Sequence, residues 1–148
     1  MSIKRINSNS RLSGAVTFGD LVFLSGQVPG DSTDVTGQTA EVLAKIDGLL
    51  AEAGSDKDHL LNATIYLNNI GRDFAAMNEV WSQWLSPGKA PTRTTLQAQL
   101  ARPEVLVEIT VIAARRSFDL PTTENNNAKN HVDRLHPWPA VRQSGPGQ

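Results

Sequence analysis

Residues 90–114 constrain the fold most, because they contain two strand-like runs joined by a short polar link. Each run alternates apolar and polar residues, and the link Ala101-Arg102-Pro103-Glu104 contains a proline, which interrupts regular structure. The pattern predicts an antiparallel hairpin with one apolar face. Its other face would carry two charges that simple alternation does not explain, Arg93 and Glu108.

The register of this hairpin predicts where the two charges lie. Pairing outward from the link places Arg93 opposite Ile112 and Glu108 opposite Gln97, a separation of about 13 Å along the strands. Without a bulge, the two charges would not form a simple ion pair within one chain. The face that they share is too apolar for solvent and too polar for a core, as expected of a surface that meets another subunit. This face comprises Arg93, Thr95, Gln97, Gln99, Leu106, Glu108, Thr110 and Ile112.

Composition narrows the class of protein. A chain of 148 residues fits one domain with an ordinary core, and the absence of cysteine excludes disulfides and thiolate chemistry. A net charge of -1 gives no electrostatic reason to expect nucleic acid or an anionic membrane as a partner. No apolar run is long enough for a membrane span, and the N-terminus lacks a signal-peptide core. We therefore expect a soluble, cytoplasmic protein.

Three further strands and two helices are predicted before residue 90. The strands are expected at 15–18, 21–28 and 60–68, the first two forming a hairpin around Gly19-Asp20. One helix is expected at 36–53 with Gly54 as its stop, and a second is expected to be capped by Asp73. Their buried positions would be Val42, Leu43, Ile46, Leu49 and Leu50, then Phe74, Met77, Trp81 and Trp84 or Leu85, with Leu61, Ala63, Ile65 and Leu67 on the strand at 60–68.

The order β-β-α-β-α-β-β predicts an α+β domain, with a mixed sheet and both helices on one face. We place this domain at residues 1–116. Residues 117–148 are rich in Pro, Asn and Gly and are predicted to be a C-terminal tail, either mobile or docked on the surface.

Several short motifs together resemble the RidA (YjgF/YER057c/UK114) family over roughly residues 3 to 116. They occur in the family's order and are Ser25-Gly26-Gln27-Val28-Pro29, Gln38-Thr39, Ala53-Gly54, Asp73-Phe74 with Asn78, Ala90-Pro91-Thr92-Arg93 and Val107-Glu108-Ile109. The resemblance implies a chorismate-mutase-like fold assembled as a homotrimer with clefts between subunits. It also implies hydrolytic deamination of reactive enamines and imines, such as 2-aminoacrylate and 2-iminopropionate, to 2-keto acids and ammonia, with no metal or organic cofactor.

The resemblance also implies roles for individual residues. Arg93 matches the arginine that holds the substrate carboxylate, and Glu108 matches the glutamate that positions the attacking water. Ser25, Gly26, Asn78 and Thr95 fall at positions that line the cleft and are candidates for substrate binding.

Each candidate also has a structural interpretation. Arg93 could be an interface arginine, and Glu108 could be its buried partner across that interface. Ser25 with Gly26 could be a strand end or bulge, and Asn78 could be a hydrogen-bonded buried amide.

The chain departs from the family pattern at the rim of the site. Arg11-Leu12-Ser13 stands where the family has a Gly-Pro-Tyr-Ser-like segment, so the aromatic hydroxyl is lost. Threonine occupies position 95, where many members have cysteine. These changes leave the substrate open. They also motivate an alternative function, a non-catalytic sensor or regulator that binds a small carboxylate in the same clefts.

Overall fold

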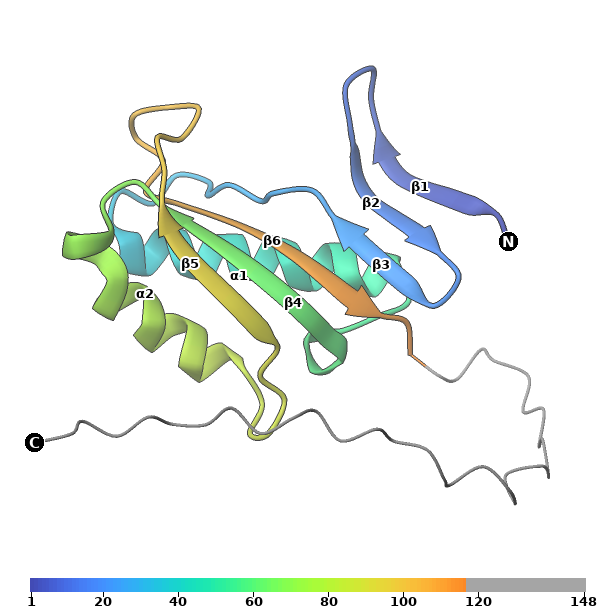
Figure 1. The fold of residues 1–148 in the computed structure, drawn as a ribbon. Coiled ribbons are helices and arrows are strands. Elements are labelled where there is room, and N and C mark those ends of the chain that lie inside the picture. The colour runs from blue at the N-terminus through green and yellow to red at the C-terminus, as the bar shows by residue number, and fades with distance from the viewer. Residues whose placement is uncertain (117–148) are drawn as a thin grey trace, which may run out of the picture.

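A computed structural model describes residues 1–116, which form one mixed six-stranded sheet with two helices on a single face (Figure 1). The predicted α+β class and the placement of both helices on one face are confirmed, and the sheet has one strand more than expected. In chain order the elements are β1 (Ile3–Ser8), β2 (Ser13–Phe18), β3 (Leu21–Leu24), α1 (Val35–Glu52), the short 3-10 helix η1 (Lys57–His59), β4 (Leu60–Leu67), α2 (Ile70–Trp84), β5 (Thr92–Gln97) and β6 (Val107–Ala114).

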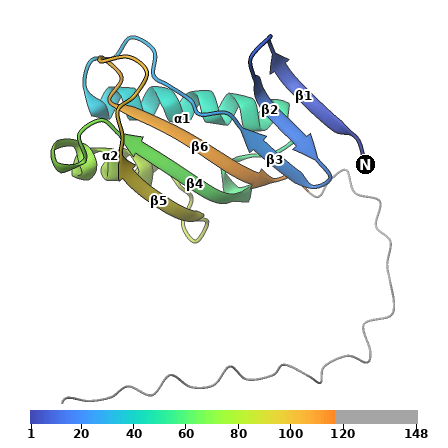
Figure 2. The same cartoon turned by 45° about the horizontal axis from the view of Figure 1, so that its top comes forward.

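Strand β4 lies between β5 and β6, so the predicted hairpin of residues 90–114 is wrong. The strand order is β1-β2-β3-β6-β4-β5, with β4 parallel to β5 and antiparallel to β6 (Figure 2). The hairpin is replaced because helix α2 connects β4 to β5. Two adjacent parallel strands need such a crossover connection, so β5 pairs with β4 and not with β6. Because β5 occupies one edge of β4, β6 takes the other.

This topology also corrects the predicted face of Arg93. Residues paired across neighbouring strands share a face of the sheet. Arg93 pairs with Ala63, which is fully buried beneath the helices, whereas Glu108 pairs with Tyr66 on the face without helices. The two charges therefore lie on opposite faces, and the single mixed face predicted for both does not exist.

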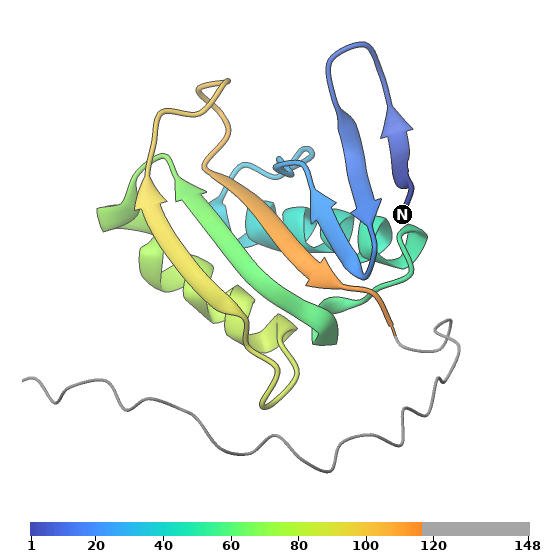
Figure 3. The same cartoon turned by 45° about the vertical axis from the view of Figure 1, so that its right-hand side comes forward.

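The N-terminal part of the sheet contains a strand that the sequence did not predict. Strand β1 pairs with β2 but has five exposed residues of six, so it carries almost no apolar alternation to reveal it. The predicted turn at Gly19-Asp20 is confirmed, with Phe18 paired to Leu21 and Gly19 at a φ of 58°. The hairpin of β1 and β2 extends away from the rest of the sheet (Figure 3).

Helix α1 confirms its prediction to within one residue at each end. Asp34 caps its first turn by accepting a hydrogen bond from the Gly37 amide. At the other end, Gly54 has a φ of 79° and its amide donates to the Ala51 carbonyl, while the Ser55 amide donates to that of Leu50. These two bonds are the Schellman motif, which needs a left-handed residue at the position of Gly54.

The N-cap of helix α2 lies four residues before its predicted position at Asp73. Asn69 is the N-cap and accepts a hydrogen bond from the Arg72 amide. Asp73 lies in the first turn instead, where it is buried and paired with Arg72 at 2.9 Å. Met77 and Trp81 are buried as predicted, whereas Phe74 is 40% exposed.

The core lies between the helices and the sheet. An irregularity between Leu60 and Asn62 reverses the predicted roles at the start of β4, so that Leu60 is buried and Leu61 is 45% exposed. The largest fully buried side chains are Leu43, Ile46, Leu50, Ile65, Leu67, Met77 and Ile109.

The tail predicted at 117–148 lies beyond the described residues. Among residues 1–116, neither helix is long and apolar enough to cross a bilayer.

Gly48 within α1 and Gly54 just after its end provide a matched test of the helix end. We expect Gly54→Ala to lower the free energy of unfolding by about 1–2 kcal/mol, because an L side chain is strained in the left-handed region. Gly48 is an exposed mid-helix residue with no atom within 4 Å of an added Cβ. Gly48→Ala should therefore stabilise the protein by about 0.5–1 kcal/mol. Urea unfolding measures both, and equal effects of the two substitutions would contradict this account.

Candidate functional site

One half of the candidate site is Arg93, on the edge strand β5 beneath α2. Its Nη1 donates a hydrogen bond of 2.7 Å to Oδ1 of Asn78. The guanidinium carbon also lies 6.0 Å from the ring centroid of Phe74 and 5.7 Å from that of Trp81, within the range of cation–π attraction. An amide and two aromatic rings therefore hold the arginine in place.

The three α2 residues that surround Arg93 are Phe74, Asn78 and Trp81, and their spacing in the sequence explains why they lie side by side. Positions 74, 78 and 81 are four and three residues apart, which puts them on one face of a helix. Sequence reasoning assigned Phe74 and Trp81 to the core and only Asn78 to the site. The i, i+4, i+7 spacing around Asn78 was the signal that could have identified the two rings as walls of the arginine site.

The charge of Arg93 is not neutralised within residues 1–116. None of the three ion pairs in this part of the chain includes it. Burial lowers the pKa of Arg93 from its ordinary value, since desolvation disfavours the charged form. Arginine nevertheless stays protonated, and its planar fork suits bidentate binding of a carboxylate. The arrangement can therefore bind a small anion.

Thr95 lies two residues beyond Arg93 and shares its face of the sheet, since it pairs with the buried Ile65. Its Oγ1 is the one buried side-chain polar atom without a hydrogen-bond partner among the described residues. A buried hydroxyl without a partner is unfavourable by about 1–3 kcal/mol. A ligand or a second chain could supply the missing bond, so Thr95 stays a candidate binding residue on physical grounds.

The other half of the candidate site is Glu108 on β6, with Gly26 beside it. An alanine Cβ built at position 26 would lie 3.0 Å from Cδ of Glu108. Glycine at this position leaves room for the carboxylate where it lies, and a side chain there would displace the carboxyl group by a few tenths of an ångström. Glu108 is partly exposed and takes part in none of the ion pairs found in residues 1–116.

Ser25 connects this half of the site to β2. Its hydroxyl donates to the Ser13 carbonyl, and its amide donates to that of Gly14. The strand-end interpretation of Ser25 therefore accounts for its contacts within the chain. These bonds fix the segment that carries Gly26.

The two halves do not meet within one chain. In the sheet, Arg93 aligns with Val111, three residues from Glu108 and two strands away. The backbone separation is therefore about 14 Å, and the two side chains lie on opposite faces. The structure brings Arg93 together with Asn78 and Thr95, and Glu108 together with Gly26 and the neighbouring Ser25. Within residues 1–116, no group of His, Asp or Glu side chains is arranged to hold a metal ion.

The fold and site together define a class: a small α+β domain whose cationic and carboxylate candidate residues lie on opposite faces of one sheet. Residues 2–115 match the family described as Endoribonuclease L-PSP. The chain belongs to this family, whose members are also named YjgF and RutC proteins.

The similarity to known relatives extends over nearly the whole length of each relative. RutC family protein YoaB from Escherichia coli is 41% identical over 114 residues, covering 77% of this chain and 99% of the relative. A RutC family protein from Haemophilus ducreyi is 41% identical over 113 residues, covering 76% and 96%. A YjgF family member from Neisseria meningitidis superposes with a TM-score of 0.77 at 48% identity, covering 78% and 97%. A YjgF/YER057c/UK114 member from Mycobacterium tuberculosis gives 0.70 at 28% identity, covering 76% and 99%.

The unpartnered hydroxyl of Thr95 leads to a stability prediction. We expect Thr95→Val to raise the free energy of unfolding by about 1 kcal/mol, because it replaces a buried hydroxyl without a partner by a methyl group of similar size. Thr94→Val on the opposite, exposed side of β5 is the control, with an expected change within about 0.5 kcal/mol. Urea unfolding measures the change in the free energy of unfolding for both variants. A loss of stability in Thr95→Val would mean that the hydroxyl already has a partner in the assembled protein.

Proposed function

We propose that this protein hydrolyses reactive 2-imino and 2-enamino acids, of the 2-iminopropionate and 2-aminoacrylate type, to 2-keto acids and ammonia. The observation that carries the proposal is the partly buried, un-neutralised guanidinium of Arg93, positioned by Asn78 and two aromatic rings. It is suited to the carboxylate that all these substrates share. Membership of the YjgF/RutC family supports this proposal.

The proposed site lies between subunits. Glu108 and Arg93 face away from each other within one chain, so a second copy would have to place its own Glu108 near the arginine. The face without helices supplies an apolar contact surface for this assembly, since several large side chains on it are 37–45% exposed. These are Phe18, Leu21, Phe23 and Leu96. We propose a homotrimer, in which three such contacts close a ring.

The chemistry needs one base and one anchor. In the imine tautomer, water adds to the C=N carbon while the Glu108 carboxylate orients it and accepts one of its protons. Glu108 returns that proton to nitrogen, which gives an aminoalcohol. The hydroxyl proton of the aminoalcohol then passes to nitrogen through the same carboxylate, and the C–N bond breaks to leave a carbonyl and ammonia. Arg93 holds the carboxylate throughout, so a labile substrate is kept beside its water. No step requires a redox partner, since water supplies both the oxygen and the protons.

A second function is favoured by one observation. The Arg93 half of the site is complete in a single chain and does not need Glu108 to bind an anion. A protein that only binds small carboxylates, as a sensor or regulator, would use this half alone. Calorimetry with pyruvate or 2-oxobutyrate on protein that shows no turnover would favour this function over deamination.

The deaminase proposal predicts two distinct defects. Arg93→Ala should lower kcat/KM at least about 100-fold by removing the carboxylate anchor, whereas Glu108→Gln should lower kcat about 100-fold and change KM little. The measurement is loss of semicarbazide-trappable imine generated by an amino-acid oxidase. The controls Arg116→Ala and Glu52→Gln make equivalent charge changes at exposed positions away from both halves. Wild-type protein that does not accelerate imine loss would exclude the proposal.

The divided site predicts complementation between inactive variants. When Arg93→Ala and Glu108→Gln chains are mixed one to one and reassembled, about a quarter of the intersubunit sites should combine an intact arginine with an intact glutamate. Activity should therefore return to about a quarter of the wild-type value, although each variant alone is about 100-fold less active than wild type. No recovery, in mixtures shown by mass spectrometry to have exchanged subunits, would mean that each site is built within one chain.

A further inference from the structure

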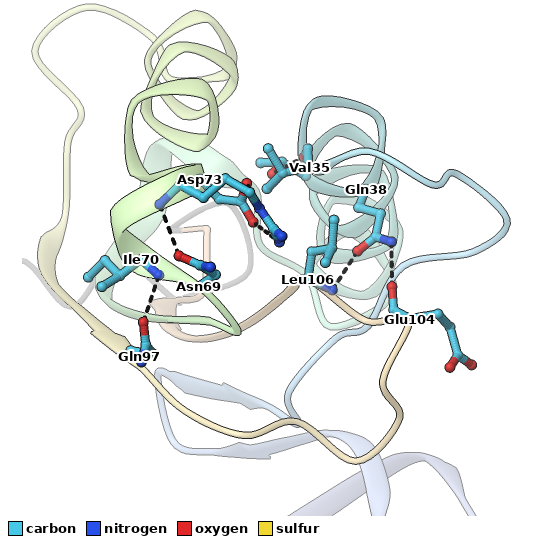
Figure 4. Close-up of polar contacts among 10 residues, drawn as sticks. Val35, Gln38, Asn69, Ile70, Asp73, Gln97, Glu104 and Leu106 are labelled. Carbon is cyan, nitrogen blue, oxygen red and sulfur yellow. Dashed lines mark hydrogen bonds and ion pairs between the residues drawn. The ribbon is translucent and has the colours of Figure 1, made fainter.

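The side chain of Gln38, which the proposed chemistry does not use, joins two loops beside the Glu108 half of the site. Gln38 lies in the first turn of α1 and is only 2% exposed. Its Nε2 donates to the Ser32 carbonyl at 3.0 Å and to the Glu104 carbonyl at 2.8 Å. Its Oε1 accepts a hydrogen bond of 2.8 Å from the Leu106 amide. Figure 4 shows the amide between the backbone groups of Glu104 and Leu106.

These bonds hold both segments that determine where Glu108 lies. Leu106 is two residues before Glu108, at the point where the chain enters β6. Ser32 belongs to the loop that follows Gln27, and Gln27 exchanges two backbone hydrogen bonds with Ile109. Gly26, whose missing side chain makes room for Glu108, precedes Gln27 directly. One amide thus connects the strand that carries the carboxylate to the loop that borders it.

A hollow separates the two loops, and the Gln38 amide is bonded to both of them, whereas Glu41 and Lys45 of α1 bond only the loop that contains Ser32. A pocket of about 380 Å³ is lined by the segment Pro29–Thr33 on one side and by Arg102 and Glu104–Leu106 on the other, with Gln38 in its wall. Loops that do not pack tightly against each other need another connection to keep a fixed spacing. Gln38 provides this connection, because the two N–H groups of its amide donate to carbonyl oxygens of the two loops. No donor of the amide is left unused.

The position of Gln38 is itself fixed by the core. The adjacent Thr39 is fully buried and donates to the Val35 carbonyl, and Val42 on the next turn is also fully buried. Helix α1 is therefore a rigid support for the amide. A change in the amide alone would alter the two loops without displacing the helix.

We infer that Gln38 is a positioning residue for Glu108, which sets the carboxylate against the Gly26 segment through its bonds to both loops. This inference rests on the proposed function for its kinetic consequence, but the structural part can be tested without it. It predicts that the substrate anchor at Arg93, on the opposite face, is unaffected.

The test uses Gln38→Glu, which keeps size and shape but removes both N–H donors. At neutral pH the new carboxylate would face two carbonyl oxygens, and we expect kcat to fall about tenfold or more with KM within about twofold, since a misplaced catalytic group is costly to the rate. Burial raises the pKa of the introduced carboxyl. As the pH falls, the carboxyl becomes protonated and regains one donor, so the ratio of variant to wild-type kcat should rise. Gln83→Glu, at an exposed position of α2, is the matched control and should show neither effect.

Hydrogen–deuterium exchange supplies the measurement that does not depend on activity. In Gln38→Glu, amide protection should fall in peptides covering residues 26–33 and 104–109 and stay unchanged in β4 and α2. Unchanged protection in both peptides, or a uniform loss across the domain, would overturn the inference. If wild type is inactive, the proposed function fails and the exchange result alone decides on Gln38. If wild type is active and kcat of the variant is unchanged, the positioning role fails while deamination stands.

Discussion

The pairing of β4 on both of its edges determines most of what is distinctive in this fold. Helix α2 returns the chain so that β5 lies parallel to β4, and β6 must then take the opposite edge. Two runs that are adjacent in sequence are thereby separated by a strand. The consequence for the site is direct, because Arg93 falls under the helices and Glu108 falls on the open face. If β5 and β6 formed a hairpin, both charges could share one face of one chain.

The two halves of the site are built on different supports. Arg93 depends on α2, whose residues 74, 78 and 81 surround the guanidinium with two rings and an amide. Glu108 depends on backbone contacts between β6 and the segment after β3, and on the glycine that makes space for its carboxylate. Binding and proton transfer would therefore be separable properties in this protein. A substitution in α2 should affect the anchor, and one in the 26–33 segment should affect the base.

The sequence predicted those elements whose signals are local. Helix α1 was identified within one residue at each end because its apolar stripe and the glycine at position 54 are both encoded in adjacent residues. The turn at Gly19 was identified for the same reason. Strand β1 was missed because it is exposed on both faces, and the cap of α2 was misplaced because Asp73 is an equally good cap in sequence but is used for an ion pair with Arg72.

Non-local pairing was the main part of the fold that could not be read from the chain. Arg93 and Glu108 were identified as charges that strand alternation does not explain, and the family motifs then implied their roles, but their relative position depends on which strands are neighbours. Alternation cannot distinguish a hairpin from two strands separated by a third. The contacts of Arg93 with Phe74 and Trp81 depend on the same unknown, since they arise only when β5 lies beneath α2.

The exit of the chain from β6 has a practical consequence. The Arg115 amide donates to the Asp20 carbonyl and the Arg116 amide to that of Gly54, so the end of the sheet domain is tied to the β2–β3 turn and to the end of α1. Along β6, Ala114 is about 20 Å from Glu108, at the far end of the strand. Within one chain, a fluorophore, affinity label or surface linker attached just after residue 116 would thus begin well away from Glu108. That end of the domain is therefore a place for a label that leaves the Glu108 half of the site free.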